Sequence, residues 1–190
     1  MVYVTILFIV KKGFFIKTAK KKIIFLDRDG VINKDHGYVS KIEEFEFIDG
    51  VFDTCKYFNS LGYEIIVVTN QSGIARGYYT KNDFEKLTTY MLQKFEENGV
   101  KILKVYFCPH SPEINCSCRK PNIGMIEDAC RDFEIDLNKS WLIGDKISDI
   151  ETAINANIKN HILITNEKNK TLKISSITNS LSDTINIITK

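Results

Sequence analysis

The chain of 190 residues is poor in several features, and each shortage excludes a class of protein. Its formal net charge is only +2 and it has no long lysine or arginine tract, which argues against a nucleic-acid binder. No apolar run approaches the roughly 18 residues that span a bilayer. Five cysteines are an odd number, and without a convincing secretory signal they disfavour a disulfide framework. We therefore expect a cytoplasmic protein, monomeric, that binds neither nucleic acid nor membrane.

The first twenty residues differ from the rest of the chain. The opening MVYVTILFIV is apolar, but no positive charge precedes it and no small-residue cleavage site follows, as a signal peptide requires. We interpret residues 1–20 as an N-terminal extension without a chemical role, and residues 21–190 as one domain.

Short apolar runs alternate with amphipathic segments along the domain. This alternation predicts an α/β fold: a three-layer, Rossmann-like parallel sheet with right-handed crossovers. The expected strands are residues 23–26, 64–68, 102–107, 140–143 and 161–165. The expected helices are residues 50–60, 80–98, 123–133 and 148–157, with a last helix from Ser182.

Polar side chains follow three of these strands where each strand ends. Asp27 and Asp29 follow the first, Thr69 and Asn70 follow the second, and Asp145 follows the fourth. Because ligands bind at the carboxyl ends of parallel strands, we expect these groups to meet at one edge of the sheet. Two carboxylates this close together need a cation between or beside them. Mg²⁺ suits this place, because it takes a few carboxylate oxygens and leaves coordination positions for phosphate. The alternative for DRDG alone is an ordinary polar turn.

Four motifs in this order resemble those of the haloacid dehalogenase superfamily of phosphatases, over residues 22–183. They are the DxD of Asp27 and Asp29, then Thr69, then Lys120, and the GDxxxD of residues 144–149. The resemblance implies a Mg²⁺-dependent phosphatase in which Asp27 attacks phosphorus and Asp29 is the general acid and base.

The same resemblance implies the ligands. Mg²⁺ would be held by Asp27, Asp145 and the backbone carbonyl of Asp29. For Asp149, metal support and a helix-start carboxylate remain open alternatives. Phosphate groups of the substrate would be bound by Thr69, Asn70, Gln71, Arg119, Lys120 and Lys146.

A second cluster lies in the proline-containing segment CPHSPEINCSC, residues 108–118. Cys108, His110, Cys116 and Cys118 are a complete set of four ligands for a closed, tetrahedral Zn²⁺ site. The alternative is a chance cluster of buried thiols. We expect a structural zinc whose loop presents the following Arg119 and Lys120.

The zinc loop resembles the branch that holds heptose bisphosphate and histidinol-phosphate phosphatases. The motifs DHGYV (residues 35–39), TNQSGIARG (69–77) and GDK (144–146) look most like the heptose enzymes. That likeness implies release of the 7-phosphate from D-glycero-D-manno-heptose 1,7-bisphosphate, in the synthesis of nucleotide-activated heptose for lipopolysaccharide or capsule. About forty residues separate Asp27 from Thr69, which leaves no room for a large cap domain.

Three other functions compete with this reading. A histidinol-phosphate phosphatase would need acidic groups at the mouth, for which Glu43, Glu44 and Glu46 are the only available cluster. A non-enzymatic zinc module that binds a partner would have no use for the four motifs. A DNA 3′-phosphatase is disfavoured by the near-neutral charge.

Overall fold

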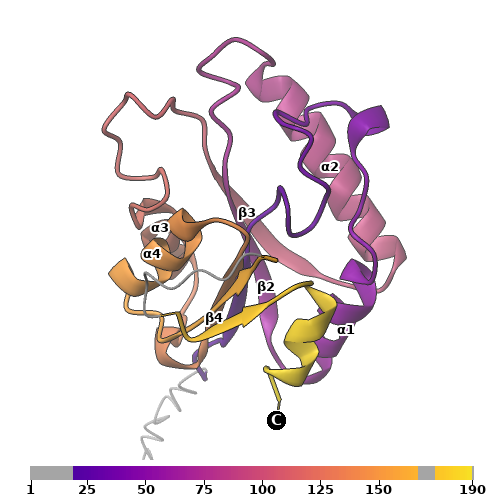
Figure 1. The fold of residues 1–190 in the computed structure, drawn as a ribbon, viewed down its shortest axis with the longest axis vertical. Coiled ribbons are helices and arrows are strands. Elements are labelled where there is room, and N and C mark those ends of the chain that lie inside the picture. Colours follow the sequence, from indigo (N-terminus) through magenta and orange to yellow (C-terminus); the bar gives the residue numbers. More distant parts are fainter. Residues whose placement is uncertain (1–18, 167–173, 190) are drawn as a thin grey trace, which may run out of the picture.

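The computed structural model describes residues 19–166 and 174–189, which form a six-stranded parallel sheet in the order β3-β2-β1-β4-β5-β6 (Figure 1). The strands are β1 (Ile23–Leu26), β2 (Glu64–Asn70), β3 (Ile102–Cys108), β4 (Trp141–Gly144), β5 (Asn160–Ile164) and β6 (Ser176–Thr178). The order reverses direction between β1 and β4, which is the switch point where open α/β sheets bind ligands. The predicted Rossmann-like parallel sheet is confirmed.

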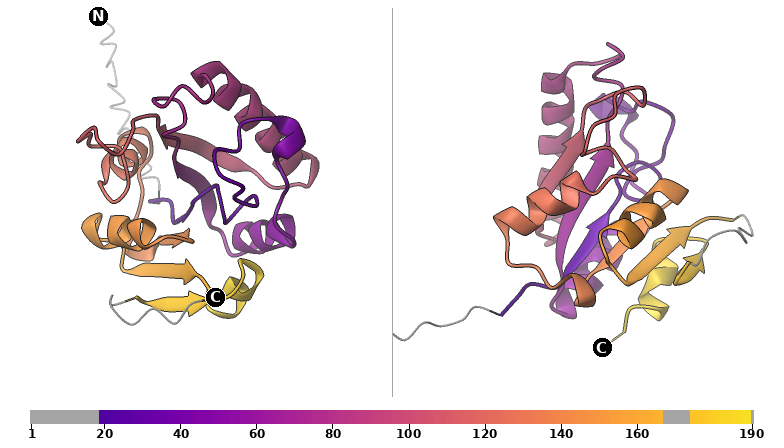
Figure 2. Two further views of the ribbon diagram at one scale, coloured as in Figure 1. Left: turned by 45° about the horizontal axis from the view of Figure 1, so that its top comes forward. Right: turned by 90° about the vertical axis from the view of Figure 1, so that its left-hand side faces the viewer.

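Helices cover both faces of the sheet, and together they make the three predicted layers (Figure 2). They are α1 (Val51–Ser60), α2 (Lys81–Glu97), α3 (Gly124–Asp132) and α4 (Ile147–Asn155), with short 3₁₀ turns η1 (Ile42–Glu44), η2 (Leu137–Lys139) and η3 (Ser182–Asn186). Helices α1 and α2 and the segment around η3 pack on one face, while α3 and α4 pack on the other. Among the described residues, no helix is long and apolar enough to cross a membrane.

Strand β1 lies in the middle of the sheet, between β2 and β4, and its four side chains, IIFL, have no exposed surface. Successive side chains of a strand point to opposite faces, so Ile24 and Leu26 join the core under α1 and α2. Ile23 and Phe25 join the core under α3 and α4. Burial on both faces explains why this strand carries no polar residue until Asp27.

Aromatic side chains of the segment between β1 and α1 pack against those of α1 and α2. The ring of Phe47 lies 4.9 Å from that of Phe45 and 4.8 Å from that of Phe52, measured between centroids. The ring of Phe52 in turn lies 5.2 Å from that of Phe95 on α2. These contacts hold residues 34–47 over the edge of the sheet where β1 ends.

Two local expectations were wrong. The C-terminal segment forms a sixth strand, β6, that was not expected, and the helix expected from Ser182 begins there but is the short 3₁₀ turn η3. Helix α4 begins one residue earlier than the expected residue 148: Lys146 is the N-cap, and its N–H donates to the Asp149 carboxylate at 3.0 Å. That carboxylate therefore combines a helix-start role with the ion pair described below.

Loops occupy the place of a cap domain in the described part of the chain. The loops that follow β2 and β3 extend beyond the top of the sheet in Figure 1, and the rings of Tyr38 and Tyr78, 4.6 Å apart, place the loop after β2 beside residues 34–47. The expected absence of a large cap is confirmed. The predicted N-terminal extension falls mostly on residues 1–18, which lie outside the described residues, and the proposed domain boundary at residue 21 stays a prediction.

Candidate active site and metal centres

Lys120 lies at the centre of the polar groups at the sheet edge. Its Nζ lies 2.9 Å from Asp27 Oδ1 and 2.5 Å from Asp149 Oδ1, and it donates to the carbonyl oxygen of Val68 at 3.0 Å. The side chains of Lys120, Asp27 and Asp149 are 6% exposed or less, so the ion pairs are shielded from water. The two ion pairs and the hydrogen bond to Val68 fix the ammonium group beside Asp27.

Asp27, Asp145 and Asp149 form a group that could hold a metal ion, with one oxygen of each within 4.8 Å of the others. Three carboxylates are opposed by the ammonium groups of Lys120 and Lys146, which leaves an excess of negative charge if all three are ionised. Asp145 Oδ1 is buried and has no hydrogen-bond partner within residues 19–166 and 174–189. An unpaired buried oxygen beside excess negative charge is the environment that a divalent cation stabilises.

Two glycines let these carboxylates approach the backbone. A Cβ at Gly30, where φ is +84°, would lie 2.1 Å from Asp145 Oδ2. A Cβ at Gly144 would lie 2.3 Å from the Asp149 carboxylate. Neither position can carry a side chain without displacing an acid of the group, which gives the glycines of DRDG and GDxxxD a physical reason.

The pKa values show how strongly the group disfavours additional negative charge. Burial and the neighbouring charge of Asp27 raise the pKa of Asp145 to about 7. Burial also raises the pKa of Asp27, against the attraction of Lys120. Burial opposes the charge of Lys120, but Asp149 and Asp27 outweigh it and raise the pKa of that ammonium. Lys120 therefore stays positively charged. The neighbouring carboxylates favour the binding of a second cation.

The carboxylate of Asp29 belongs to a separate hydrogen-bond network. Its Oδ2 accepts a hydrogen bond from Gln71 Nε2 at 3.0 Å, and the same amide donates to Thr69 Oγ1 at 2.8 Å. Its two oxygens also accept from the Arg28 guanidinium, and Asn33 Nδ2 donates to Oδ1 at 3.1 Å. The network joins the ends of β1 and β2, as the parallel sheet predicts.

The other predicted ligands lie at the rim and have protein partners. The side chain of Asn70 brackets the backbone of Lys120, accepting from its N–H at 3.1 Å and donating to its carbonyl at 3.3 Å. Arg119 Nη1 lies 3.4 Å from the carbonyl oxygen of His110. Lys146 Nζ lies 3.0 Å from Asp35 Oδ2 in the loop after β1. Burial opposes the charge of Lys146, but Asp145 and Asp35 outweigh it and raise its pKa.

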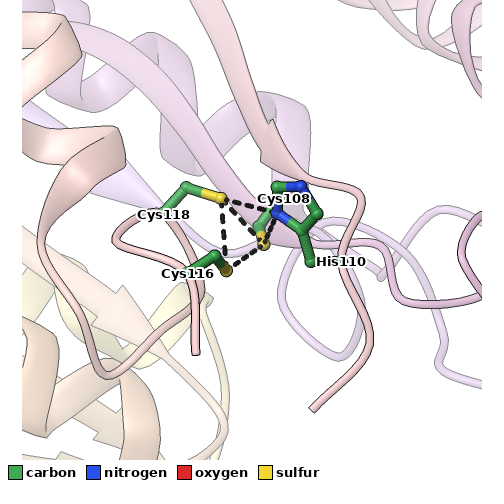
Figure 3. Close-up of side chains that lie close together, drawn as sticks. All are labelled: Cys108, His110, Cys116 and Cys118. Atoms are coloured by element: carbon green, nitrogen blue, oxygen red, sulfur yellow. Dashed lines mark hydrogen bonds between the residues drawn. The ribbon is translucent and has the colours of Figure 1, made fainter. Parts of the chain in front are cut away.

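The predicted zinc ligands converge (Figure 3). Cys108 Sγ lies 3.0 Å from Cys118 Sγ and 3.5 Å from Cys116 Sγ, and His110 Nδ1 lies 3.3 Å from Cys118 Sγ. A tetrahedron with Zn–S bonds of 2.3 Å has edges of about 3.8 Å, so small shifts would complete it. The set can hold a metal, and all four coordination positions would be filled by protein.

The surroundings act differently on the three thiols of this cluster, because burial raises the pKa of Cys108 and of Cys118 but does not decide that of Cys116. Burial opposes ionisation of the Cys116 thiol, but hydrogen bonds from the Arg119 N–H and the neighbouring ligands outweigh it and lower its pKa to about 7. The loop also packs tightly on α3, because a Cβ at Gly124 would lie 2.7 Å from the carbonyl oxygen of Ser117. The cluster thus holds the loop between the end of β3 and the start of α3. Lys120 lies in this loop, directly after the cluster.

Sequence reasoning missed several residues of the site. Arg28 and Tyr79 were given no role, although Arg28 is 2% exposed and bonds to Asp29, and the Tyr79 hydroxyl donates to Gln71 at 2.6 Å. A charged residue between two aspartates at the end of a buried strand was the available signal for Arg28. For Tyr79 there was none, because its contact depends on how the loop after β2 folds back.

Comparisons with known proteins agree with this geometry. Residues 22–173 match the family model described as polynucleotide kinase 3 phosphatase. The chain is 51% identical over 149 residues to D-glycero-alpha-D-manno-heptose-1,7-bisphosphate 7-phosphatase of Campylobacter jejuni, covering 78% of this chain and 86% of the relative. It is 50% identical over 151 residues to D-glycero-beta-D-manno-heptose-1,7-bisphosphate 7-phosphatase of Helicobacter pylori, covering 79% and 87%.

Solved structures give the same result. The crystal structure of D,D-heptose 1,7-bisphosphate phosphatase from B. bronchiseptica, complexed with magnesium and phosphate, matches with a TM-score of 0.78 at 26% identity, covering 87% of this chain and 97% of that one. The chain therefore belongs to the polynucleotide kinase 3 phosphatase family, as a relative of the D-glycero-D-manno-heptose-1,7-bisphosphate 7-phosphatases among the haloacid dehalogenase-like phosphatases, in agreement with the resemblance seen in its motifs.

Proposed function

We propose that this protein is a Mg²⁺-dependent phosphatase that releases the 7-phosphate of D-glycero-D-manno-heptose 1,7-bisphosphate. The observation that carries the proposal is the group formed by the buried Asp27 and Asp149 and the half-buried Asp145 around Lys120, at the switch point of the sheet. Such a group suits phosphoryl transfer, because an anionic nucleophile can approach phosphate only beside compensating positive charge. The names of the relatives supply the substrate.

The residues divide the reaction between them. Asp27 forms a bond to phosphorus as the ester oxygen leaves, giving an aspartyl-phosphate, and Asp29 donates a proton to the leaving oxygen. Asp29 then accepts a proton from the water that hydrolyses the intermediate. Lys120 and the Thr69 hydroxyl contact the phosphoryl oxygens, where negative charge develops.

The proposed metals fit the donor sets of their sites. Asp27, Asp145 and the backbone carbonyl of Asp29 would hold Mg²⁺, which neutralises phosphate charge when it is bound. Asp149 supports that site indirectly, by orienting Lys120 at 2.5 Å. Cys108, His110, Cys116 and Cys118 would hold a structural Zn²⁺ that fixes the loop before Arg119 and Lys120.

The second phosphate of the substrate requires cations outside the reaction centre. Lys120 lies buried beside Asp27 in the reaction centre, so we assign the contact with the second phosphate to Arg119 and Lys146 at the rim. Lys146 would exchange its partner Asp35 for phosphate, whereas Gln71 and Asn70 serve positioning contacts within the protein. We further propose a cytoplasmic monomer acting on a small molecule.

The rival histidinol-phosphate phosphatase is not favoured by the mouth of the site. It needs unpaired acids to attract a cationic substrate, but Glu46 pairs with Lys34, and Glu44 Oε1 lies 3.1 Å from Lys41 Nζ. Of the predicted acidic cluster, this leaves Glu43 alone without an ion pair among the described residues.

The test is phosphate release in the presence of Mg²⁺ from four substrates. They are the α and β anomers of heptose 1,7-bisphosphate, histidinol phosphate, and a DNA oligonucleotide with a 3′-phosphate. We expect a kcat/KM preference of about tenfold or more for one heptose anomer, equivalent to about 1.4 kcal/mol of transition-state discrimination. A preference for histidinol phosphate or DNA would overturn the substrate, and no turnover of any would overturn the enzyme class.

A further inference from the structure

Arg28 is an unusual residue for the interior, because it is a charged side chain with only 2% of its surface exposed. Its Nη2 lies 2.7 Å from Asp29 Oδ1 and 2.9 Å from Oδ2, and its Nε lies 3.1 Å from Oδ1. Nη2 also donates to the carbonyl oxygen of Val39 at 2.9 Å, and the rings of Phe45 and Phe84 lie about the guanidinium. A buried arginine is costly unless it is hydrogen-bonded, and here most of its hydrogen bonds go to one carboxylate.

Gln71 holds the same carboxylate from the other side. Its Nε2 donates to Asp29 Oδ2 at 3.0 Å and to Thr69 Oγ1, while its Oε1 accepts from the Tyr79 hydroxyl at 2.6 Å. Burial raises the pKa of Tyr79 to about 12, so the hydroxyl keeps its proton and donates. The Tyr79 ring is seated over Gly73, where a Cβ would lie 2.2 Å from it. Tyr79 therefore fixes which end of the Gln71 amide faces Asp29.

Both oxygens of Asp29 are thus held by buried donors, with five hydrogen bonds from Arg28, Asn33 and Gln71. We propose that Arg28, Gln71 and Tyr79 are positioning residues that orient the Asp29 carboxylate for proton transfer. Through the carbonyl oxygen of Val39, Arg28 links that orientation to residues 34–47, the loop beside the mouth. The inference rests on the proposed role of Asp29 as general acid.

This role has a chemical signature that a purely structural network lacks. Loss of an ester oxygen from a sugar needs a proton in the transition state, whereas p-nitrophenolate leaves as a stable anion without one. The parameter kcat/KM covers the steps up to departure of the leaving group and excludes hydrolysis of the intermediate. Misorienting Asp29 should therefore lower kcat/KM much more for a sugar phosphate than for p-nitrophenyl phosphate.

The experiment compares Tyr79→Phe with Tyr106→Phe as a matched control. Each tyrosine is 8% exposed and each hydroxyl donates at 2.6 Å, Tyr79 to Gln71 and Tyr106 to Asp132 on α3, away from the site. For both variants, kcat/KM is measured with p-nitrophenyl phosphate and with the sugar phosphate that the wild type hydrolyses fastest. Unfolding temperatures are recorded alongside. Arg28→Lys, which keeps the charge but not the bidentate fork, is the second variant.

The quantity compared is the ratio of kcat/KM for the sugar phosphate to kcat/KM for p-nitrophenyl phosphate. We expect this ratio to fall about fivefold or more in Tyr79→Phe and in Arg28→Lys. Such a fall is part of the roughly 10²–10⁴-fold that general acids typically contribute. Tyr106→Phe should leave the ratio unchanged. An unchanged ratio in Tyr79→Phe, or equal losses on both substrates, would overturn the proposal while leaving the phosphatase assignment intact. A wild type that hydrolyses neither substrate would instead overturn the proposed function on which it rests.

Discussion

At the scale of single residues, the site depends on a few side chains whose replacement by close relatives changes the chemistry more than the packing. Asp27 accepts from Lys120 and from the N–H of Arg28 through the same oxygen, Oδ1. This arrangement orients the carboxylate so that its other oxygen can serve as nucleophile.

Replacing Asp27 by asparagine should abolish turnover while preserving the fold. The amide is not a nucleophile, so phosphate release should fall by about 10³-fold or more. Burial already raises the pKa of Asp27, so the neutral isostere should shift the unfolding temperature by only a few degrees. Retained activity in a correctly folded variant would mean that another group attacks phosphorus.

Gly30 offers a second test at this scale. Gly30→Ala places a methyl group 2.1 Å from Asp145 Oδ2 and should remove both Mg²⁺ binding and activity. The control is Gly99→Ala, where φ is also positive but nothing lies within 4 Å of the new Cβ. The control should lose about 1–2 kcal/mol of unfolding free energy from backbone strain alone and keep full activity. Equal activity in the two variants would show that contact with Asp145 is unimportant.

At the scale of elements, the loop from β3 to α3 matters most, because it places Lys120 against strands β1 and β2. Its Cys–His cluster and its close packing on Gly124 substitute for regular structure. A loop with few apolar contacts gains rigidity from a metal that binds the folded state alone.

Cys116→Ser should therefore lose bound zinc and stability together. We expect the zinc content to fall from one equivalent to near zero and the free energy of unfolding to drop by on the order of 3 kcal/mol, as for other losses of a structural metal. Metal analysis and thermal unfolding measure the two effects. Cys130→Ser, which changes a cysteine exposed on α3, is the control and should alter neither. Absence of zinc from the wild type would contradict the assignment.

At the scale of the whole molecule, the acidic group couples metal binding to pH and stability. Asp145 titrates at about 7 in the folded chain, against an ordinary value of 3.8. The metal-free folded state therefore binds the extra proton between these values, and its stability decreases as the pH rises from about 4 to 7. Mg²⁺ needs the ionised carboxylates and stabilises only the folded state.

Stabilisation by Mg²⁺ should consequently be larger at pH 8 than at pH 5. Thermal unfolding with and without Mg²⁺ measures this difference at each pH. Asp145→Asn should lose most of the effect, while Asp53→Asn, on the exposed side of α1, should keep it. The same Mg²⁺-dependent shift at both pH values, or an undiminished shift in Asp145→Asn, would contradict the role of this carboxylate.

The sequence by itself determined the parallel sheet and which polar residues meet at its edge. Buried runs such as Ile23–Leu26 require covering on both faces, and parallel strands deliver Asp27, Thr69 and Asp145 to one edge whatever the details of packing. The spacing of the four zinc-ligand candidates was equally informative, because soft ligands rarely gather in a proline-containing loop without a metal.

Only the tertiary structure decided how these residues interact. Lys120 reaches Asp149 and Asn70 brackets the Lys120 backbone across many residues of sequence, and neither contact has a local signal. The same holds for the contacts of Arg28 and Tyr79, and for the C-terminal segment, where β6 forms because β5 offers it an open edge. Local periodicity determines which elements form, whereas long-range packing determines which buried polar groups become partners.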